Sequence, residues 1–306
     1  MNQGGGGQRS EGALWTLHAG ASGMLKQRCV MDGKILFLDL DGTLLNDQKE
    51  CTEGNRRAIE RALAMGHRVV ITSGRPLKSA LAQAERLGLA GHGCYVIAYN
   101  GAVIYDCSRQ REIFRRVLPL EDLYAIFDEA NRRRVHIQTY SEEHVIVESG
   151  NDNETVRRYC GLTGLSFRVI EDIRRDLPVP PVKALLIDFR DRALTGEMER
   201  WIRAHMQGTV DCFFSSQHYL EVVPVGMNKG YAVTALCRKL CIPIQNTIAV
   251  GDEANDISML QAAGVGVAMK NAVPEVKEAA DYITGRDNNH DGIEEVVGQF
   301  LTETSI

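Results

Sequence analysis

The stretch that decides the fold is residues 35–43, which read ILFLDLDGT. Four apolar residues, Ile35–Leu38, come first, and two acids with one leucine between them follow. An unbroken apolar run of this length is typical of a strand that is buried on both faces of a parallel sheet. Ligands of open α/β sheets bind outside the carboxyl ends of such strands. We therefore expect Asp39 and Asp41 to lie at a functional site.

These two acids carry the first chemical prediction. Because side chains alternate along a strand, Asp39 and Asp41 share one side and Leu40 takes the other. Two carboxylates this close repel each other unless a cation or a proton intervenes, and a hard cation such as Mg²⁺ prefers oxygen ligands. One carboxylate could then attack while the other transfers protons. Gly42 permits a sharp exit and exposes amides to an anion. The alternative, a surface turn without chemistry, is disfavoured by the buried strand.

An alternation of strands and helices continues on both sides of this stretch. Helices begin or end at typical signals such as Pro76 and Gly88. This order predicts an open, doubly wound α/β sheet that is mostly parallel. Asn100-Gly101 is typical of a two-residue hairpin turn. The expected strands after the first are Val69–Ile71, Tyr95–Tyr99, Val103–Tyr105, Ile248–Val250 and Gly264–Met269.

The middle of the chain has a different rhythm. Pairs of strands separated by helices predict an α+β layer with one antiparallel sheet. Since the α/β rhythm returns after Val225, this layer is interpreted as an insertion into the α/β domain. The predicted organisation is a flexible extension over residues 1–30, a core of residues 31–117 and 225–306, and an inserted module over residues 118–224.

Composition narrows the possible functions. A chain of 306 residues suggests about two domains and can bury a core without disulfides. The net charge of −5 argues against a broad basic surface for nucleic acid. No apolar run is long enough to predict a membrane-spanning helix. The eight cysteines are scattered, and the start lacks a secretory signal pattern, so a cytoplasmic protein with reduced thiols is expected.

Two further motifs suggest phosphate binding. Thr72–Pro76 stands between a strand and a helix, where the hydroxyl of Ser73, the backbone at Gly74 and free helix amides could cradle a phosphate. The alternative is an ordinary helix N-cap. Lys229 begins a helix and could supply a point charge for a phosphate. The alternative there is a solvated surface lysine.

The fourth motif is Gly251–Asp256, which reads GDEAND between an apolar strand and a helix. Three acids and an amide at a strand end indicate another part of a metal site, although acids also favour helix N-termini. All four motifs are predicted at one edge of the same sheet, and their agreement is the strongest argument for function.

Taken together, these motifs resemble those of the haloacid dehalogenase superfamily, and more narrowly the Cof-type phosphatases with a large α+β cap. The resemblance covers about residues 33–306. Asp39–Thr43 matches the first motif, D-x-D-G-T, and Gly251–Asp256 matches the fourth, G-D-x-x-N-D. Ser73 and Lys229 match the second and third. The second motif usually reads A-T-G-R in Cof-type proteins, so T-S-G-R is a departure that keeps the hydroxyl.

The resemblance implies a role for each matching residue. Asp39 would be the nucleophile and a magnesium ligand. Asp41 would be the general acid and base, with its backbone carbonyl on the metal. Asp252 would bind magnesium, and Asn255 and Asp256 would support phosphate, water and metal. The predicted phosphate-binding residues are Gly42, Ser73, Gly74, Lys229 and Asn255, and the predicted metal site comprises Asp39, Asp41 and Asp252 with Asp256 behind them.

The resulting prediction is a magnesium-dependent phosphatase that acts through an aspartyl-phosphate, with a mobile cap. Its substrate would be a small phosphorylated metabolite, such as a sugar phosphate, pyridoxal phosphate or flavin mononucleotide. The protein is expected to be a monomer or a homodimer, without a nucleic acid or membrane partner. The alternatives are a sugar phosphomutase and a non-catalytic phospho-acceptor or sensor. Asp41 and the insertion argue against the sensor, since receivers lack both.

Some residues keep open interpretations. Asn100 and Asn271 resemble Cof-type landmarks without a settled role. His136, His144 and His218 are outside candidates for substrate contact. The run Arg132–Arg134 is interpreted as a solvated helix end, with an anion-binding patch as the alternative.

Overall fold

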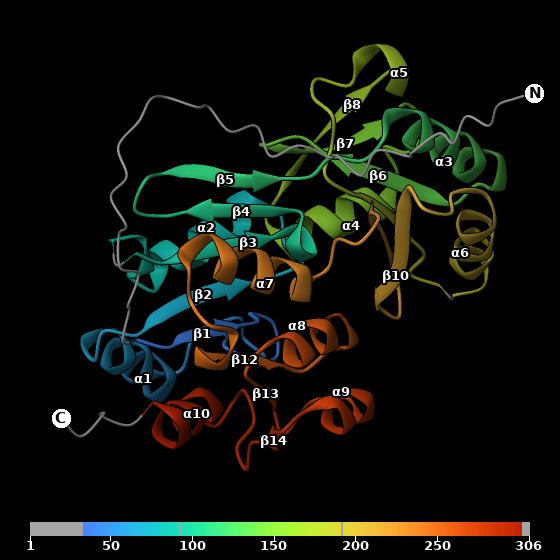
Figure 1. Ribbon diagram of the computed structural model, residues 1–306. Helices are drawn as coiled ribbons and strands as arrows, with labels where there is room; N and C mark the ends of the chain where they lie inside the picture. Colours follow the sequence, from blue (N-terminus) through green and yellow to red (C-terminus); the bar gives the residue numbers. More distant parts are fainter. Residues whose placement is uncertain (1–32, 92, 191, 302–306) are drawn as a thin grey trace, which may run out of the picture.

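The computed structural model describes residues 33–91, 93–190 and 192–301. The predicted extension over residues 1–30 lies outside these ranges. Within them the chain forms two sheets, one of eight strands and one of six (Figure 1). We call the segment that carries the smaller sheet, Leu120–Pro224, the cap, and the rest the core. The chain enters the cap between Arg115 and Leu120 and leaves it between Pro224 and Lys229.

The larger sheet confirms the doubly wound α/β prediction. Its order is β14-β13-β12-β1-β2-β3-β4-β5, and every pair from β14 to β3 is parallel, whereas β4 and β5 form an antiparallel edge. The strands are β1 (Ile35–Leu38), β2 (Arg68–Thr72), β3 (Tyr95–Ala98), β4 (Val103–Asp106), β5 (Arg111–Arg115), β12 (Thr247–Gly251), β13 (Val265–Ala268) and β14 (Tyr282–Ile283).

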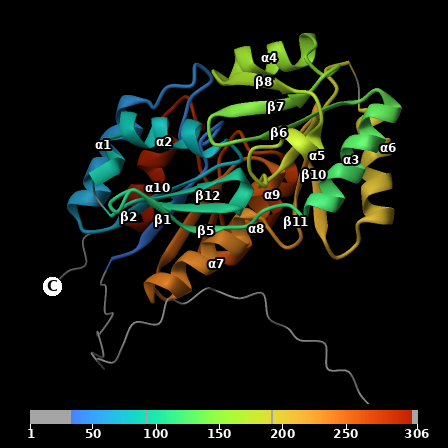
Figure 2. The ribbon, with the colours of Figure 1, turned by 90° about the horizontal axis from the view of Figure 1, so that it is seen from above.

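Helices cover both faces of this sheet. Figure 2 shows α1, α2 and α10 on one side and α7 and α8 on the other, and α1 packs on α10 as α7 packs on α8. The helices of the core are α1 (Glu53–Ala64), α2 (Leu77–Arg86), α7 (Lys229–Leu240), α8 (Ile257–Ala262), α9 (Pro274–Ala279) and α10 (Gly292–Phe300).

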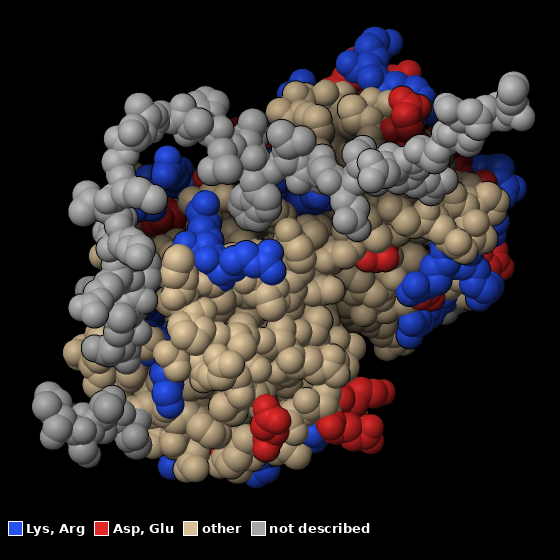
Figure 3. Space-filling model, in the orientation of Figure 1, with Lys and Arg blue, Asp and Glu red and all other residues tan. Residues whose placement is uncertain are grey.

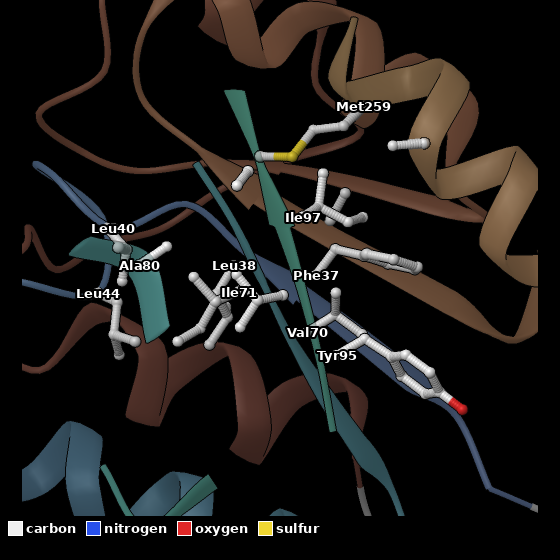
Figure 4. Packing of buried hydrophobic residues seen from close by; sticks show 14 of the residues in the cluster. Phe37, Leu38, Leu40, Leu44, Val70, Ile71, Ala80, Tyr95, Ile97 and Met259 are labelled. Atoms are coloured by element: carbon white, nitrogen blue, oxygen red, sulfur yellow. The ribbon is translucent and has the colours of Figure 1, made fainter. Parts of the chain in front are cut away.

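The first strand lies in the middle of the core, as its apolar run predicts. All four residues of Ile35–Leu38 are fully buried. Figure 4 shows Phe37 and Val70 on the side of Met259, while Leu38 and Ile71 face the opposite side. Burying one such large side chain contributes about 1.5–3 kcal/mol. Because β1 is buried on both faces of the sheet, its end is fixed in the core, and so are the positions of the acids that follow it.

The cap has its own sheet, in the order β10-β11-β9-β6-β7-β8. The prediction of an α+β layer with one antiparallel sheet is correct for four of its five strand pairs and wrong for the fifth. There β7 and β8 run parallel, and α4 forms the crossover between them. Its strands are β6 (His136–Tyr140), β7 (His144–Glu148), β8 (Ser166–Ile170), β9 (Ala184–Ile187), β10 (Val210–Ser216) and β11 (Tyr219–Pro224), and its helices are α3 (Leu120–Arg133), α4 (Glu154–Thr163), α5 (Ile173–Asp176) and α6 (Ala193–His205).

The two faces of the cap sheet pack differently. Residues of α3, α5 and α6 form a separate apolar cluster on one face. On the other face, Tyr140, Tyr159 and Leu185 belong to the same cluster as the core strands. The cap therefore rests on the core through apolar side chains.

The hairpin between β3 and β4 differs from the predicted two-residue turn. Four residues separate the paired Ala98 and Val103, and Tyr99–Gly101 form a 3-10 turn. Tyr99, Asn100 and Gly101 all have positive φ angles, of 53°, 55° and 103°. A positive φ is strained for a residue such as Tyr99, whereas glycine adopts it freely, and strained backbone is often found at functional sites.

The outer surface carries mixed charge. On the face drawn in Figure 3, basic and acidic side chains are interspersed, and many of them lie on the cap. Among the described residues, no helix combines the length and the apolar composition needed to cross a membrane.

Candidate active site

Three buried carboxylates meet where two neighbouring strands of the larger sheet end. Asp39 follows β1, and Asp252 and Asp256 follow β12, which pairs in parallel with β1. Their carboxylate oxygens lie within 4.8 Å of one another. No other group of three His, Cys, Asp or Glu side chains comes this close in the part of the chain that the structure describes. Parallel pairing thus brings the first and fourth motifs together.

Lys229 enters this cluster from the first turn of α7. Its ammonium is fully buried and donates to Oδ1 of Asp39 and to Oδ1 of Asp256, each at 2.5 Å. The side chain of Asn228 caps the helix by accepting from the backbone N–H of Tyr231. The solvated-lysine alternative is therefore wrong. One ammonium among three carboxylates leaves an excess of two negative charges if all of them are ionised.

Burial and repulsion raise the proton affinity of these acids. Burial raises the pKa of Asp39 well above its ordinary value, and the Lys229 ammonium offsets this only in part. Burial also raises the pKa of Asp252 to about 7, although a hydrogen bond from Thr43 lowers it. Neighbouring Asp256 adds to both shifts. A divalent cation would favour the ionised forms instead.

The cluster fits a hard divalent cation. Its donors are carboxylate oxygens alone, the ligand type that Mg²⁺ prefers, and it offers none of the thiolate or imidazole ligands typical of softer metals. The excess of negative charge points the same way. Asp39 and Asp252 are the residues that would bind the ion most directly, because both oxygens of Asp256 already accept hydrogen bonds. Its Oδ1 accepts from Lys229, and its Oδ2 accepts from the backbone N–H groups of Asp252 and Glu253. Asp39 gives only its Oδ1 to Lys229.

The carboxylate of Asp41 lies apart from this cluster and has different partners. The guanidinium of Arg75 donates from Nε to Oδ2 at 2.7 Å and from Nη2 to Oδ1 at 2.6 Å, and Lys49 adds an ion pair at 2.8 Å. Burial raises the pKa of Asp41, but the hydrogen bonds and charges of Arg75 and Lys49 outweigh it and hold the pKa below its ordinary value. Any part that Asp41 takes in metal binding is left to its backbone carbonyl, as the resemblance implies.

Gly42 and Thr43 join the first motif to the fourth. Gly42 has a φ of 86°, and a Cβ there would lie 2.2 Å from Oδ2 of Asp252, so a larger residue would be strained and would displace that carboxylate. Thr43 donates from Oγ1 to Oδ1 of Asp252 at 2.6 Å. Asn271 donates from Nδ2 to the carbonyl of Gly42 at 2.7 Å, which gives this landmark a structural role.

The second motif forms a loop after β2. The hydroxyl of Ser73 accepts from the backbone N–H of Arg75 at 3.2 Å. A Cβ on Gly74 would lie 3.0 Å from Oδ1 of Asn100, and Asn255 donates to that same oxygen at 3.0 Å. The Nδ2 of Asn100 is buried and has no hydrogen-bond partner in the described structure. A buried amide donor without a partner therefore lies next to Gly74 and Asn255, two of the predicted phosphate-binding residues.

A cavity of about 180 Å³ lies beside these groups. Phe213 and Phe214 of β10 in the cap form its apolar wall. Its core lining is Asn100, Asn228, Lys229, Ala254, Asn255 and Ser258. A larger cavity of about 510 Å³ lies where Leu77 and Lys78 of α2 meet the cap, but none of the predicted site residues lines it. The smaller cavity is thus the one that predicted site residues line, namely Lys229 and Asn255.

Three residues with clear partners in the site had no predicted role. Arg75 and Thr43 stand inside the second and first motifs, so their placement followed from the motif positions. Lys49 belongs to no motif. It lies in a turn where the side chain of Asn46 accepts from the backbone N–H of Gln48, and this turn brings Lys49 back to Asp41.

The other sequence candidates lie away from the cluster. His136 contacts Gln138 within the cap sheet at 3.1 Å, and His218 contacts the backbone carbonyl of Asp188 at 3.0 Å. Neither these two nor His144 lines the 180 Å³ cavity. Within the run Arg132–Arg134, the first two arginines bind Glu129 on the same helix, as expected for a helix end.

Comparison with known proteins points to one family. A protein family described as haloacid dehalogenase-like hydrolase matches residues 36–297. The chain is 30% identical over 273 residues to the putative phosphatase YxeH of Bacillus subtilis, with 88% of this chain and 98% of that protein covered. It is 31% identical over 278 residues to the 5-amino-6-(5-phospho-D-ribitylamino)uracil phosphatase YcsE of the same organism, with 91% and 100% covered.

Solved structures are similar as well. A haloacid dehalogenase-like hydrolase from Bacteroides thetaiotaomicron matches with a TM-score of 0.80 and 32% identity, over 87% of this chain and 99% of that one. The subclass IIB sugar phosphatase BT4131 matches with a TM-score of 0.75 and 25% identity, over 87% and 98%.

Proposed function

The chain belongs to the haloacid dehalogenase-like hydrolases, and from this premise we propose that it hydrolyses a small phosphorylated metabolite through a phosphoryl group carried on Asp39. It is an enzyme of the phosphatase type, as its relatives are. The observation that supports the mechanism best is the buried cluster of Asp39, Asp252 and Asp256 around the ammonium of Lys229.

The first half-reaction transfers the phosphoryl group to the enzyme. A carboxylate oxygen of Asp39 forms a bond to phosphorus while the bond from phosphorus to the ester oxygen breaks. Asp41, in its protonated form, gives its proton to that leaving oxygen. Ser73 and Lys229 would hold the charge of the transferring group. Bound Mg²⁺, held by Asp39 and Asp252, would neutralise further phosphoryl charge.

The second half-reaction releases inorganic phosphate. Asp41, now ionised, takes a proton from water while the water oxygen attacks phosphorus and the bond to Asp39 breaks. The contacts of Arg75 and Lys49 with Asp41 favour this ionised form. The acid form needed first would be favoured by the negative charge of an arriving phosphate. One residue can thus serve both halves.

The substrate we propose is a sugar phosphate or a related cofactor or polyol phosphate. The relative YcsE is named for a substrate in which a phosphoribityl chain is joined to a uracil ring. Phe213 and Phe214 offer aromatic contact, and Asn100 offers a free amide donor. A site of this kind would contact the ring of such a substrate through the two aromatic side chains and a polar group of it through the amide. Seven free cysteines among the described residues are consistent with the proposed cytoplasmic location.

The test is a screen of phosphorylated metabolites, scored by kcat/KM with release of inorganic phosphate, with and without EDTA. The panel includes hexose phosphates, pyridoxal phosphate, flavin mononucleotide and the phosphoribityl uracil. Asp39→Asn is the negative control. Isomerised sugar phosphate with little free phosphate would favour the phosphomutase alternative. Stable phosphorylation without turnover would favour the sensor.

A further inference from the structure

A buried lysine of the cap reaches into the core at the phosphate-binding loop. Lys183 precedes β9, and its side chain is 2% exposed. Its ammonium donates to the backbone carbonyl of Gly74 at 3.1 Å and to Oε2 of Glu221 at 2.8 Å. Glu221 lies on the neighbouring β11 and also accepts from Ser215 at 2.9 Å. The cap thus supplies both members of an ion pair, and one member contacts the core.

The contact falls on one particular peptide group, the one that joins Gly74 to Arg75. Its carbonyl accepts from Lys183, and its N–H donates to the hydroxyl of Ser73 at 3.2 Å. The residue that follows, Arg75, binds both carboxylate oxygens of Asp41. This peptide therefore stands between the predicted phosphate ligand and the predicted proton donor.

The surroundings of the ammonium come from both parts of the molecule. Its nitrogen lies 5.9 Å from the ring centroid of Tyr99 in the core and 5.0 Å from that of Tyr140 in the cap. The two rings are 6.0 Å apart in an edge-to-face arrangement. The pair with Glu221 lies within the cap, so it would persist if the cap moved. The contacts of Lys183 with Gly74 and Tyr99 cross from the cap to the core, so they would be lost if the cap moved.

We propose that Lys183 is a positioning residue that couples closure of the cap to the geometry of Ser73 and Arg75. With the cap closed, the ammonium fixes the Gly74 carbonyl and thereby orients the peptide that carries both neighbours. With the cap open, that peptide loses its charged donor, and Arg75 no longer fixes the direction of the Asp41 carboxyl towards the leaving oxygen. Proton transfer from Asp41 to the leaving oxygen is therefore efficient only when the cap has closed over the substrate. This inference rests on the proposed function.

The experiment compares two phosphate esters that differ in their need for a proton. An alkyl phosphate leaves as an alkoxide unless Asp41 protonates it, whereas p-nitrophenyl phosphate has a leaving group that needs no proton. The measured quantity is kcat/KM, which reports the steps up to phosphoryl transfer. Lys183→Met should lower kcat/KM for the alkyl ester about tenfold more than for the aryl ester, as expected on losing a charge-assisted hydrogen bond. Lys183→Arg should restore part of the difference.

Two further variants separate positioning from folding. Glu221→Gln keeps the Lys183 donor, so its ratio of alkyl to aryl kcat/KM should stay near that of the wild type. The double variant Lys183→Met/Glu221→Gln leaves no unpaired buried charge and should fold even if Lys183→Met does not. It should show the selective loss. Melting temperatures report any loss of stability, which would affect both esters equally.

Equal losses for the two esters in the double variant, or no loss, would overturn the inference while leaving the phosphatase proposal intact. A wild-type enzyme that turned over neither these esters nor any metabolite of the screen would instead overturn the proposed function, and the inference with it.

Discussion

Replacing Thr43 by valine tests the link between the first motif and the proposed metal site. The substitution keeps the shape of a fully buried side chain and removes only the hydroxyl that donates to Asp252 at 2.6 Å. This hydrogen bond lowers the pKa of Asp252, which burial raises to about 7. Without it the pKa rises further, so that at neutral pH more of the carboxyl holds a proton. A proton and Mg²⁺ compete for the same oxygens.

The size of the effect follows from the kind of bond that is lost. A hydrogen bond to a charged group is worth about 1.5–3 kcal/mol, and about 1.4 kcal/mol corresponds to a factor of ten. The Mg²⁺ concentration for half-maximal activity at pH 7 should therefore rise by roughly ten- to a hundredfold in Thr43→Val. The difference should shrink as the pH rises above 7, because Asp252 then becomes increasingly ionised in the variant as well as in the wild type.

The assay is a Mg²⁺ titration of p-nitrophenyl phosphate turnover at several pH values. Thr234→Val is the matched control, because its hydroxyl contacts only backbone carbonyls of α7. An unchanged half-activating Mg²⁺ concentration at pH 7, or a difference that does not depend on pH, would refute the reasoning.

Three other outcomes are expected. Asp39→Asn should abolish turnover. Asp41→Asn should slow the release of phosphate by ~10²–10⁴ and should accumulate a phosphoenzyme from an aryl phosphate, which intact-mass spectrometry would detect as one added phosphoryl group. A phosphoryl group mapped to Ser73 would contradict this. In EDTA the melting temperature should fall as pH rises from 5 to 8, because the buried carboxyl of Asp252 has a raised pKa of about 7 and its ionisation costs stability. Saturating Mg²⁺ should remove this fall. A melting temperature in EDTA that does not change with pH would contradict the prediction. Phe213→Ala should lower kcat/KM more for ring-bearing phosphates than for glycerol phosphate, because Phe213 lines the 180 Å³ cavity. An equal loss for both would argue against contact between the substrate ring and this cavity.

The sequence was sufficient to predict the position of the cluster. The apolar run of β1 is buried on both faces, so the acids after it must leave the sheet at its edge. The parallel neighbour β12 ends at the same edge, and Asp252 therefore meets Asp39. Motif and topology gave the same answer because both depend on where the strands end.

Other features depend on contacts that no local pattern encodes. Lys183 and Gly74 lie 109 residues apart, and neither position carries a signal for the other. Lys49 reaches Asp41 only through the shape of a short turn. The strand β5 was missed because its residues are charged or half-exposed, as is common at a sheet edge, and the parallel pairing of β7 with β8 was missed because α4 allows either direction.

The contact that the cap makes on the core through Lys183 has a consequence for recombination between related chains. Its acceptor is a main-chain carbonyl, which every amino acid provides, so the hydrogen bond itself requires no particular side chain from the core that receives a foreign cap. Glu221, the partner that must match, travels with the cap itself. The four motifs all lie outside Leu120–Pro224. A gene could therefore exchange the whole cap segment in one recombination event and acquire a different substrate. The contact between Lys183 of the new cap and the Gly74 carbonyl would be kept without further mutation of the core.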